Sequence, residues 1–238
     1  MIWLGLLLPW LCFGTPPQEP ESGLSQEEVA QARSWLTSLA TTHSSLTALE
    51  AQYRQERHSL LLKKPLVAKG RFLYRPQPGC LVFQCHEPQQ IILRLDGKSY
   101  QSFHPKEKRA ERFLFSSNEL ANALMLVFQP NPKEIEKSFA YDHLETLKDG
   151  SHRLGLKPTR ETVREFLTYL EIHLEKDGKG LRGVRYLDAD TDEIRLQWTQ
   201  MKLNPKLEEN AFGDKLPLGT KVVKHKIRAE KKGGSKRN

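Results

Sequence analysis

Apolar residues recur at helical spacing after residue 25 and at strand spacing from residue 49. Ser25 and Glu28 have the spacing of a capping box, in which each side chain satisfies a backbone N–H of the other residue. We expect the helix that follows to end between residues 41 and 45. From Leu49 onward, apolar and polar residues alternate, which predicts a half-buried strand. The predicted helix has one buried face at helical spacing, formed by Val29, Ala32, Leu36, Leu39 and His43.

Further apolar runs, separated by turn signals such as Asp96-Gly97, predict a series of antiparallel strands. A second helix is expected from Ser116 or Ser117 to the prolines at 130 and 132, and a short third one within residues 162–170. The count is about ten or eleven strands and two or three helices, so the chain is mainly β with α. A sheet of that size must curl or close, and the helices are placed to cover its open face. The predicted strands after the first cover residues 70–75, 80–86, 91–95, 99–103, 109–115, 139–147, 152–156, 170–174, 181–187 and 193–202, followed by an extended piece at 212–223.

The two ends of the 238-residue chain differ from its body. Residues 2–13 are apolar and uncharged, too short to span a bilayer but suited to a secretory signal cleaved after Gly14. Residues 15–24 then form a linker, and residues 25–224 the folded domain. Residues 225–238 are predicted to be a disordered basic tail, either merely solvated or a partner for anionic lipid or polyanions. Because most of the net charge of +8 lies after residue 223, the body is nearly neutral and does not resemble a nucleic-acid-binding protein.

Little in the sequence indicates catalysis. It contains no G-x-S-x-G, H-E-x-x-H, C-x-x-C or phosphate-loop motif, and its eight histidines are dispersed. Asp188, Asp190 and Asp192 have the spacing of early calcium-loop ligands, but the required glycine is absent, and an acidic hairpin turn is expected. Cys80 and Cys85 fall on opposite faces of one strand and are expected to be free thiols. No enzyme activity, metal or cofactor is therefore predicted.

Four motifs follow one another in the body of the chain, in a fixed order and spacing: Tyr53-Arg54-Gln55; Gly70-Arg71-Phe72 with Arg75-Pro76, Gly79-Cys80-Leu81-Val82-Phe83 and Pro88; Asp96-Gly97-Lys98 with His104-Pro105; and Asn210, Phe212 and Leu216-Pro217-x-Gly219-Thr220. Together they resemble the motifs of the periplasmic lipoprotein carrier family, LolA, over about residues 25–224. The sequence departs from the family pattern at Val82 and Phe83, where Arg and Trp are common, and in an insertion at 131–138.

The resemblance implies an incomplete antiparallel β-barrel, closed by a helical lid and enclosing an apolar cavity for acyl chains. It implies that Arg75 lies on the barrel rim and donates hydrogen bonds to lid-helix backbone; the alternative is an arginine in a solvated turn before Pro76. Each candidate cavity residue could instead serve ordinary core packing. These candidates are Leu36, Phe72, Tyr74, Leu81, Phe83, Leu93, Leu95, Leu124 and Phe128.

Two functions are compatible with the resemblance. The first is a monomeric periplasmic carrier that shields the acyl chains of lipoproteins and shuttles them from an inner-membrane transporter to an outer-membrane receptor, touching the membrane surface transiently. The second is a secreted domain of the same fold that senses lipid or regulates a partner without transporting anything. Leu11 beside Cys12 argues against a lipidated N-terminal cysteine, which favours the soluble carrier over the receptor branch of the superfamily.

Overall fold

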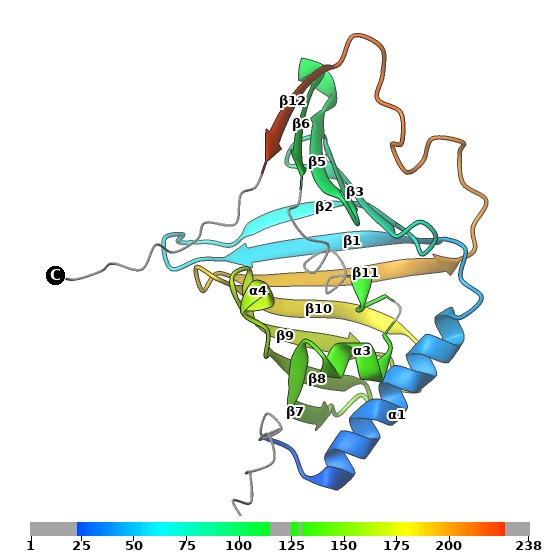
Figure 1. The fold of residues 1–238 in the computed structure, drawn as a ribbon, viewed down its shortest axis with the longest axis vertical. Helices are drawn as coiled ribbons and strands as arrows, with labels where there is room; N and C mark the ends of the chain where they lie inside the picture. The colour runs from blue at the N-terminus through cyan, green and yellow to red at the C-terminus, as the bar shows by residue number, and fades with distance from the viewer. Residues whose placement is uncertain (1–22, 115–124, 129, 227–238) are drawn as a thin grey trace, which may run out of the picture.

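The computed structural model describes residues 23–114, 125–128 and 130–226, which form one twelve-stranded sheet with short helices beside it (Figure 1). The strands follow the order β12-β6-β5-β4-β3-β2-β1-β11-β10-β9-β8-β7. Because β7 and β12 stand at opposite edges, the sheet is curled but open. The elements are α1 (Gln26–His43), β1 (Leu49–His58), β2 (Leu66–Arg75), β3 (Cys80–Glu87), β4 (Ile91–Asp96), β5 (Ser99–His104), η1 (Pro105–Glu107), β6 (Arg109–Leu114), α3 (Pro132–Glu136), β7 (Phe139–Thr146), β8 (His152–Pro158), α4 (Glu161–Arg164), β9 (Leu167–Leu174), β10 (Leu181–Asp188), β11 (Glu193–Leu203) and β12 (Lys221–Lys226).

The mainly β fold predicted from the alternation is confirmed, with one correction at the C-terminus. The extended piece expected there is a twelfth strand, β12, and it pairs with β6 in parallel, whereas all other pairs are antiparallel. The backbone N–H of Lys221 also donates to the carbonyl of Lys108, 2.8 Å away, where the two strands begin. β12 ends at Lys226, so His225 and Lys226 belong to a strand although the sequence placed them in the basic tail.

The first helix forms as its sequence predicts. Ser25 accepts a hydrogen bond from the backbone N–H of Glu28, and the Glu28 carboxylate accepts one from the backbone N–H of Ser25 at 2.8 Å. Two side chains then fix α1 against its neighbours: Trp35 stacks on the ring of His152, and Arg33 donates to Glu136 of α3 at 2.6 Å. The helix covers one end of the sheet beside β7 and β8 (Figure 1).

The predicted second helix lies mostly outside the described residues. Its last part is described: Met125 has helical conformation, and a turn follows in which the N–H of Phe128 donates to the carbonyl of Met125 at 3.0 Å. Residues 131–138, noted as an insertion, contain α3, which begins after an Asn131 cap. No helix in the described part of the chain is long and apolar enough to cross a membrane.

Strand alternation gives the sheet two faces that are covered differently. The inner, concave face carries the larger hydrophobic cluster together with α1 and residues 125–128. The outer face of β2 and β3 carries a smaller cluster, covered by the segment that leads to β12; its buried members are Leu73, Cys80, Val82, Ala211 and Phe212.

The predictions of two free cysteines and of an acidic hairpin turn at residues 188–192 are also confirmed. Cys80 is buried on the outer face and Cys85 is half-buried, and both are free. Residues 188–192 form the β10–β11 turn, in which Asp188 accepts hydrogen bonds from the backbone N–H groups of Asp190 and Asp192. That carboxylate therefore stabilises a hairpin turn.

Candidate functional site

The register of four strands aligns most of the predicted cavity residues on the inner face. Phe72 of β2 lies opposite Phe83 of β3, which lies opposite Leu93 of β4. A parallel row joins Tyr74, Leu81 and Leu95 in the same way. Since residues on one strand face alternate, all six side chains share one surface of the sheet. We call these six residues, Phe72, Tyr74, Leu81, Phe83, Leu93 and Leu95, the inner apolar face.

Burial decreases along the inner apolar face from β2 toward β4. Phe72, Tyr74 and Leu81 are at most 3% exposed, whereas Phe83, Leu93 and Leu95 are only half-buried. The second row continues beyond β4, because Leu95 lies opposite Tyr100 of β5, and Tyr100 lies opposite Phe113 of β6. These two aromatic residues are half-buried as well. Among the described residues, the apolar surface is therefore fully buried near β2 and half-buried near β4–β6.

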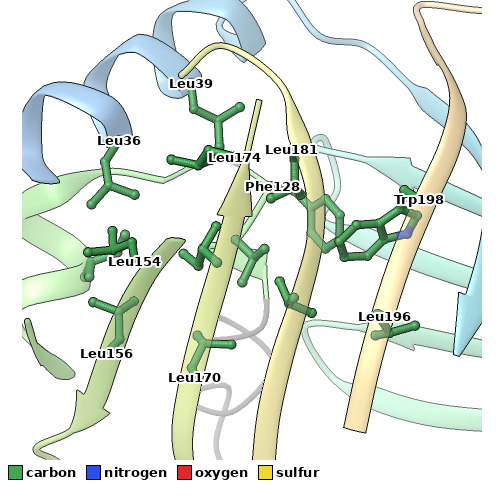
Figure 2. Packing of buried hydrophobic residues seen from close by; sticks show 14 of the residues in the cluster. Leu36, Leu39, Phe128, Leu154, Leu156, Leu170, Leu174, Leu181, Leu196 and Trp198 are labelled. Carbon is green, nitrogen blue, oxygen red and sulfur yellow. The ribbon is translucent and has the colours of Figure 1, made fainter. Parts of the chain in front are cut away.

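Phe128 fills the closed part of this surface. Its ring lies 5.0 Å from the ring of Phe72, 5.1 Å from that of Tyr74 and 5.4 Å from that of Trp198 on β11, between ring centroids. Its carbonyl oxygen lies 2.6 Å from Nδ1 of His43, at the end of α1. Burial of His43 lowers the pKa of that imidazole. The Phe128 ring thus packs between aromatic side chains of β2 and β11, and Figure 2 shows it beside Trp198.

Trp198 is the contact that sequence reasoning missed. It occupies an inward position of an alternating strand, and alternation alone does not show that it faces Phe72 at 5.6 Å between ring centroids. Its indole N–H is buried without a hydrogen-bond partner among the described residues. Tyr100 and Phe113 were missed for the same reason, since only the register across β4, β5 and β6 shows that they continue the row of Leu95 beyond the inner apolar face.

Two other predicted residues do not join this face in the described structure. Leu36 is a fully buried residue of α1, and Figure 2 shows it beside Leu154 and apart from Phe128 and Trp198. Leu124 lies outside the described residues. Both remain predictions as cavity residues.

Arg75 lies at the end of β2 on the outer face, where it binds the C-terminal segment. Its two terminal nitrogens donate to the Asp214 carboxylate, each at 3.2 Å, and its guanidinium lies 4.5 Å from the centre of the Phe212 ring. Arg94 donates to the same carboxylate at 3.0 Å and to the Phe212 carbonyl at 3.1 Å. The hydrogen bonds from Arg75 lower the pKa of Asp214. The predicted bond from Arg75 to lid-helix backbone concerns a segment that is largely outside the described residues, and it stays a prediction.

An open, curled sheet with an apolar inner face, packed against Phe128 and its neighbouring residues, defines the class of half-barrel folds with an apolar concave face. The family model for the outer membrane lipoprotein carrier protein LolA matches residues 44–214, and the chain belongs to this family. The match leaves out α1 and β12, which lie outside that range.

Known proteins similar to this chain are distant in sequence. An outer-membrane lipoprotein carrier protein of Cupriavidus pinatubonensis is 24% identical over 195 residues, which cover 82% of this chain and 86% of that protein. An uncharacterized conserved protein from Thermus thermophilus has a similar solved structure, with a TM-score of 0.51 and 12% identity over 82% of this chain and 99% of that one. A LolA superfamily protein from Nitrosomonas europaea has a TM-score of 0.41 and 11% identity, over 76% and 96% of the two chains.

Proposed function

We propose that this protein is a periplasmic carrier that shields the acyl chains of lipoproteins and moves them from the inner to the outer membrane. The observation that supports this most is the inner apolar face, which is half-buried at Phe83, Leu93 and Leu95 although it continues a fully buried core. An acyl chain in water costs about 0.8 kcal/mol per exposed methylene, so an acylated protein needs such a surface to leave a membrane.

Phe128 is proposed to exchange places with the cargo. In the described structure the Phe128 ring lies against Phe72 and Tyr74, so that the core is closed there. An acyl chain that enters along β4 and β3 would displace the ring and replace its contacts, giving two states that cargo can shift. α1 is the fixed part of the cover, because Trp35 and Arg33 hold it to β8 and α3.

The proposal extends to partners and location. An inner-membrane transporter would load the carrier and an outer-membrane receptor would unload it, and the protein would act as a monomer after cleavage near Gly14. The family is one of carriers, so binding rather than catalysis is expected. The alternative, a lipid-sensing domain without a transport role, would use the same surface, but the matched family and the curated relative are both named for carriage.

The test is to purify the protein from the envelope fraction and to identify bound lipid or lipoprotein by mass spectrometry. Leu93→Asp places a charge on the inner apolar face, and the matched control Ile92→Asp places the same charge one residue away on the outer face. We expect acyl cargo on the wild type and on the control but not on Leu93→Asp. Absence of acyl cargo on the wild type, together with failure to release lipoproteins from spheroplasts, would refute the carrier function.

The rim role of Arg75 has a separate test. Arg75→Leu removes any bond to the lid and also the pair with Asp214, whereas Asp214→Asn keeps the Arg75 side chain and weakens the pairs that Asp214 makes with Arg75 and Arg94. If Arg75 holds the lid, Arg75→Leu changes cargo retention and Asp214→Asn leaves it near wild type. An equal change in retention in both variants would show that Arg75 acts through the C-terminal segment, and wild-type retention in both would show that Arg75 does not hold the lid.

A further inference from the structure

The β1–β2 hairpin ends in a run of leucines that the described structure leaves in solvent. Leu60 is 98% exposed and Leu61 93%, while Leu62 and Leu66 are 40% and 59% exposed. The turn is ordered by Ser59, whose carbonyl accepts from the N–H of Leu62 at 3.1 Å and whose hydroxyl accepts from the N–H of Leu61 at 3.3 Å. Single exposed leucines are common, but a contiguous group marks an interaction surface. We call Leu60, Leu61, Leu62 and Leu66 the leucine tip.

The charges around the leucine tip favour an anionic bilayer as its partner. Lys63 and Lys64 follow the leucines directly, are exposed, and make no ion pair with any described residue. Nearby carboxylates lie in the β10–β11 turn: Arg57 of β1 pairs with Asp192 at 2.7 Å and with Asp188 at 3.7 Å, whereas the exposed Asp190 offsets part of the charge of the two lysines. Apolar side chains beside free lysines match the boundary between acyl chains and anionic headgroups.

One strand face connects the leucine tip with the inner apolar face. Along β2, alternation places Leu66, Ala68, Gly70 and Phe72 on the same side of the sheet, without a charged residue among them. Gly70 is buried, and a Cβ there would lie 2.0 Å from the Gln84 carbonyl oxygen, so the strands approach closely at this point. An apolar path one strand wide therefore runs from the exposed tip to the surface assigned to the acyl chain, with Gln55 and Arg57 of β1 opposite Ala68 and Leu66.

We propose that the leucine tip inserts into the surface of a lipid bilayer and holds the β2 end of the apolar path against the membrane during loading or release. The inference rests on the proposed carrier function for its purpose, but it concerns different residues. Exposed leucines enter the acyl region, and Lys63 and Lys64 remain with the phosphates.

The experiment is flotation of the exported, processed chain with vesicles of phosphatidylethanolamine and phosphatidylglycerol, and with vesicles of phosphatidylcholine. The test variant is Leu60→Asp/Leu61→Asp, and the matched control is Leu218→Asp, a leucine that is also 98% exposed but precedes β12. We expect the double variant to bind vesicles at least tenfold more weakly and the control to bind as wild type does. Lys63→Glu/Lys64→Glu should weaken binding to the anionic vesicles only.

Equal vesicle binding by the double variant and the wild type would overturn the proposal. So would a wild type that binds neither vesicle, in which case the leucines serve a protein partner. Binding of a soluble fluorescent fatty acid separates this proposal from the carrier function, because the double variant leaves the inner apolar face intact and should bind the probe normally. Vesicle binding that depends on the leucine tip, without acyl cargo on the wild type, would support the membrane contact and count against the carrier function. Acyl cargo without tip-dependent vesicle binding would support the carrier function and refute the membrane contact.

Discussion

Replacing Phe128 with alanine should lower the free energy of unfolding of the ligand-free protein and raise its affinity for acyl chains. The ring is 4% exposed and contacts three aromatic rings, on β2 and β11, at centroid distances of 5.0 to 5.4 Å. In the empty protein its removal leaves a cavity, and buried Phe→Ala changes cost about 3–5 kcal/mol. We therefore expect Phe128→Ala to lower the free energy of unfolding by about 3 kcal/mol or more.

The effect on the affinity for acyl chains is smaller, because the ligand refills the cavity. If cargo displaces the ring, the wild type must first move the Phe128 side chain into water, which costs about 2 kcal/mol. The alanine variant avoids this cost. Since about 1.4 kcal/mol corresponds to a tenfold change, the acyl chain should bind roughly 30-fold more tightly.

Urea unfolding measures the stability, and titration with a fluorescent fatty acid measures the affinity. Leu154→Ala is the matched control, because Leu154 is fully buried in the same cluster but lies apart from Phe128 in Figure 2. The control should lose about 2–5 kcal/mol of stability without a gain in affinity. If Phe128→Ala binds the fatty acid no more tightly than Leu154→Ala does, the ring is ordinary core and the exchange with cargo is wrong.

Three other results are expected. Gly70→Ala should cost about 2 kcal/mol or more, because a Cβ at Gly70 would overlap the backbone of β3, while Gly97→Ala, with open space around it, should be nearly neutral in urea unfolding. The pKa of Asp214 is lowered, so the carboxylate stabilises the fold above about pH 4, and this stabilisation is lost as the pH falls further. Asp214→Asn should remove this pH dependence of the free energy of unfolding. The stabilisation amounts to about 1 kcal/mol at most, because the carboxylate is partly exposed. Burial raises the pKa of the Cys80 thiol to about 11. A thiol reagent at about pH 8 should therefore modify the half-buried Cys85 in the folded protein and the buried Cys80 only after unfolding. Equal modification rates of the two thiols in the folded protein would contradict the assigned faces.

The elements were predictable wherever one local rule dominated. The capping box at Ser25 and Glu28 needs only neighbours three residues apart, and the alternation from Leu49 needs only one buried face. β12 was harder, because a short basic strand forms only when the edge of β6 lies beside it to supply backbone partners. Arg75 shows the same limit, since its partner Asp214 is 139 residues away and no local spacing relates the two.

The amino-acid sequence by itself determined the mainly β composition, the first helix, the faces of Cys80 and Cys85 and the family. These properties depend on periodicity and on short motifs, which act over a few residues. Only the tertiary structure decided that the inner apolar face is fully buried at β2 against Phe128 and half-buried toward β4–β6, because burial depends on how far the sheet curls and on which segment crosses it. The sequence likewise contains the leucines at 60–62, but only the fold shows that their side chains are exposed to solvent beside the β2 end of the apolar path.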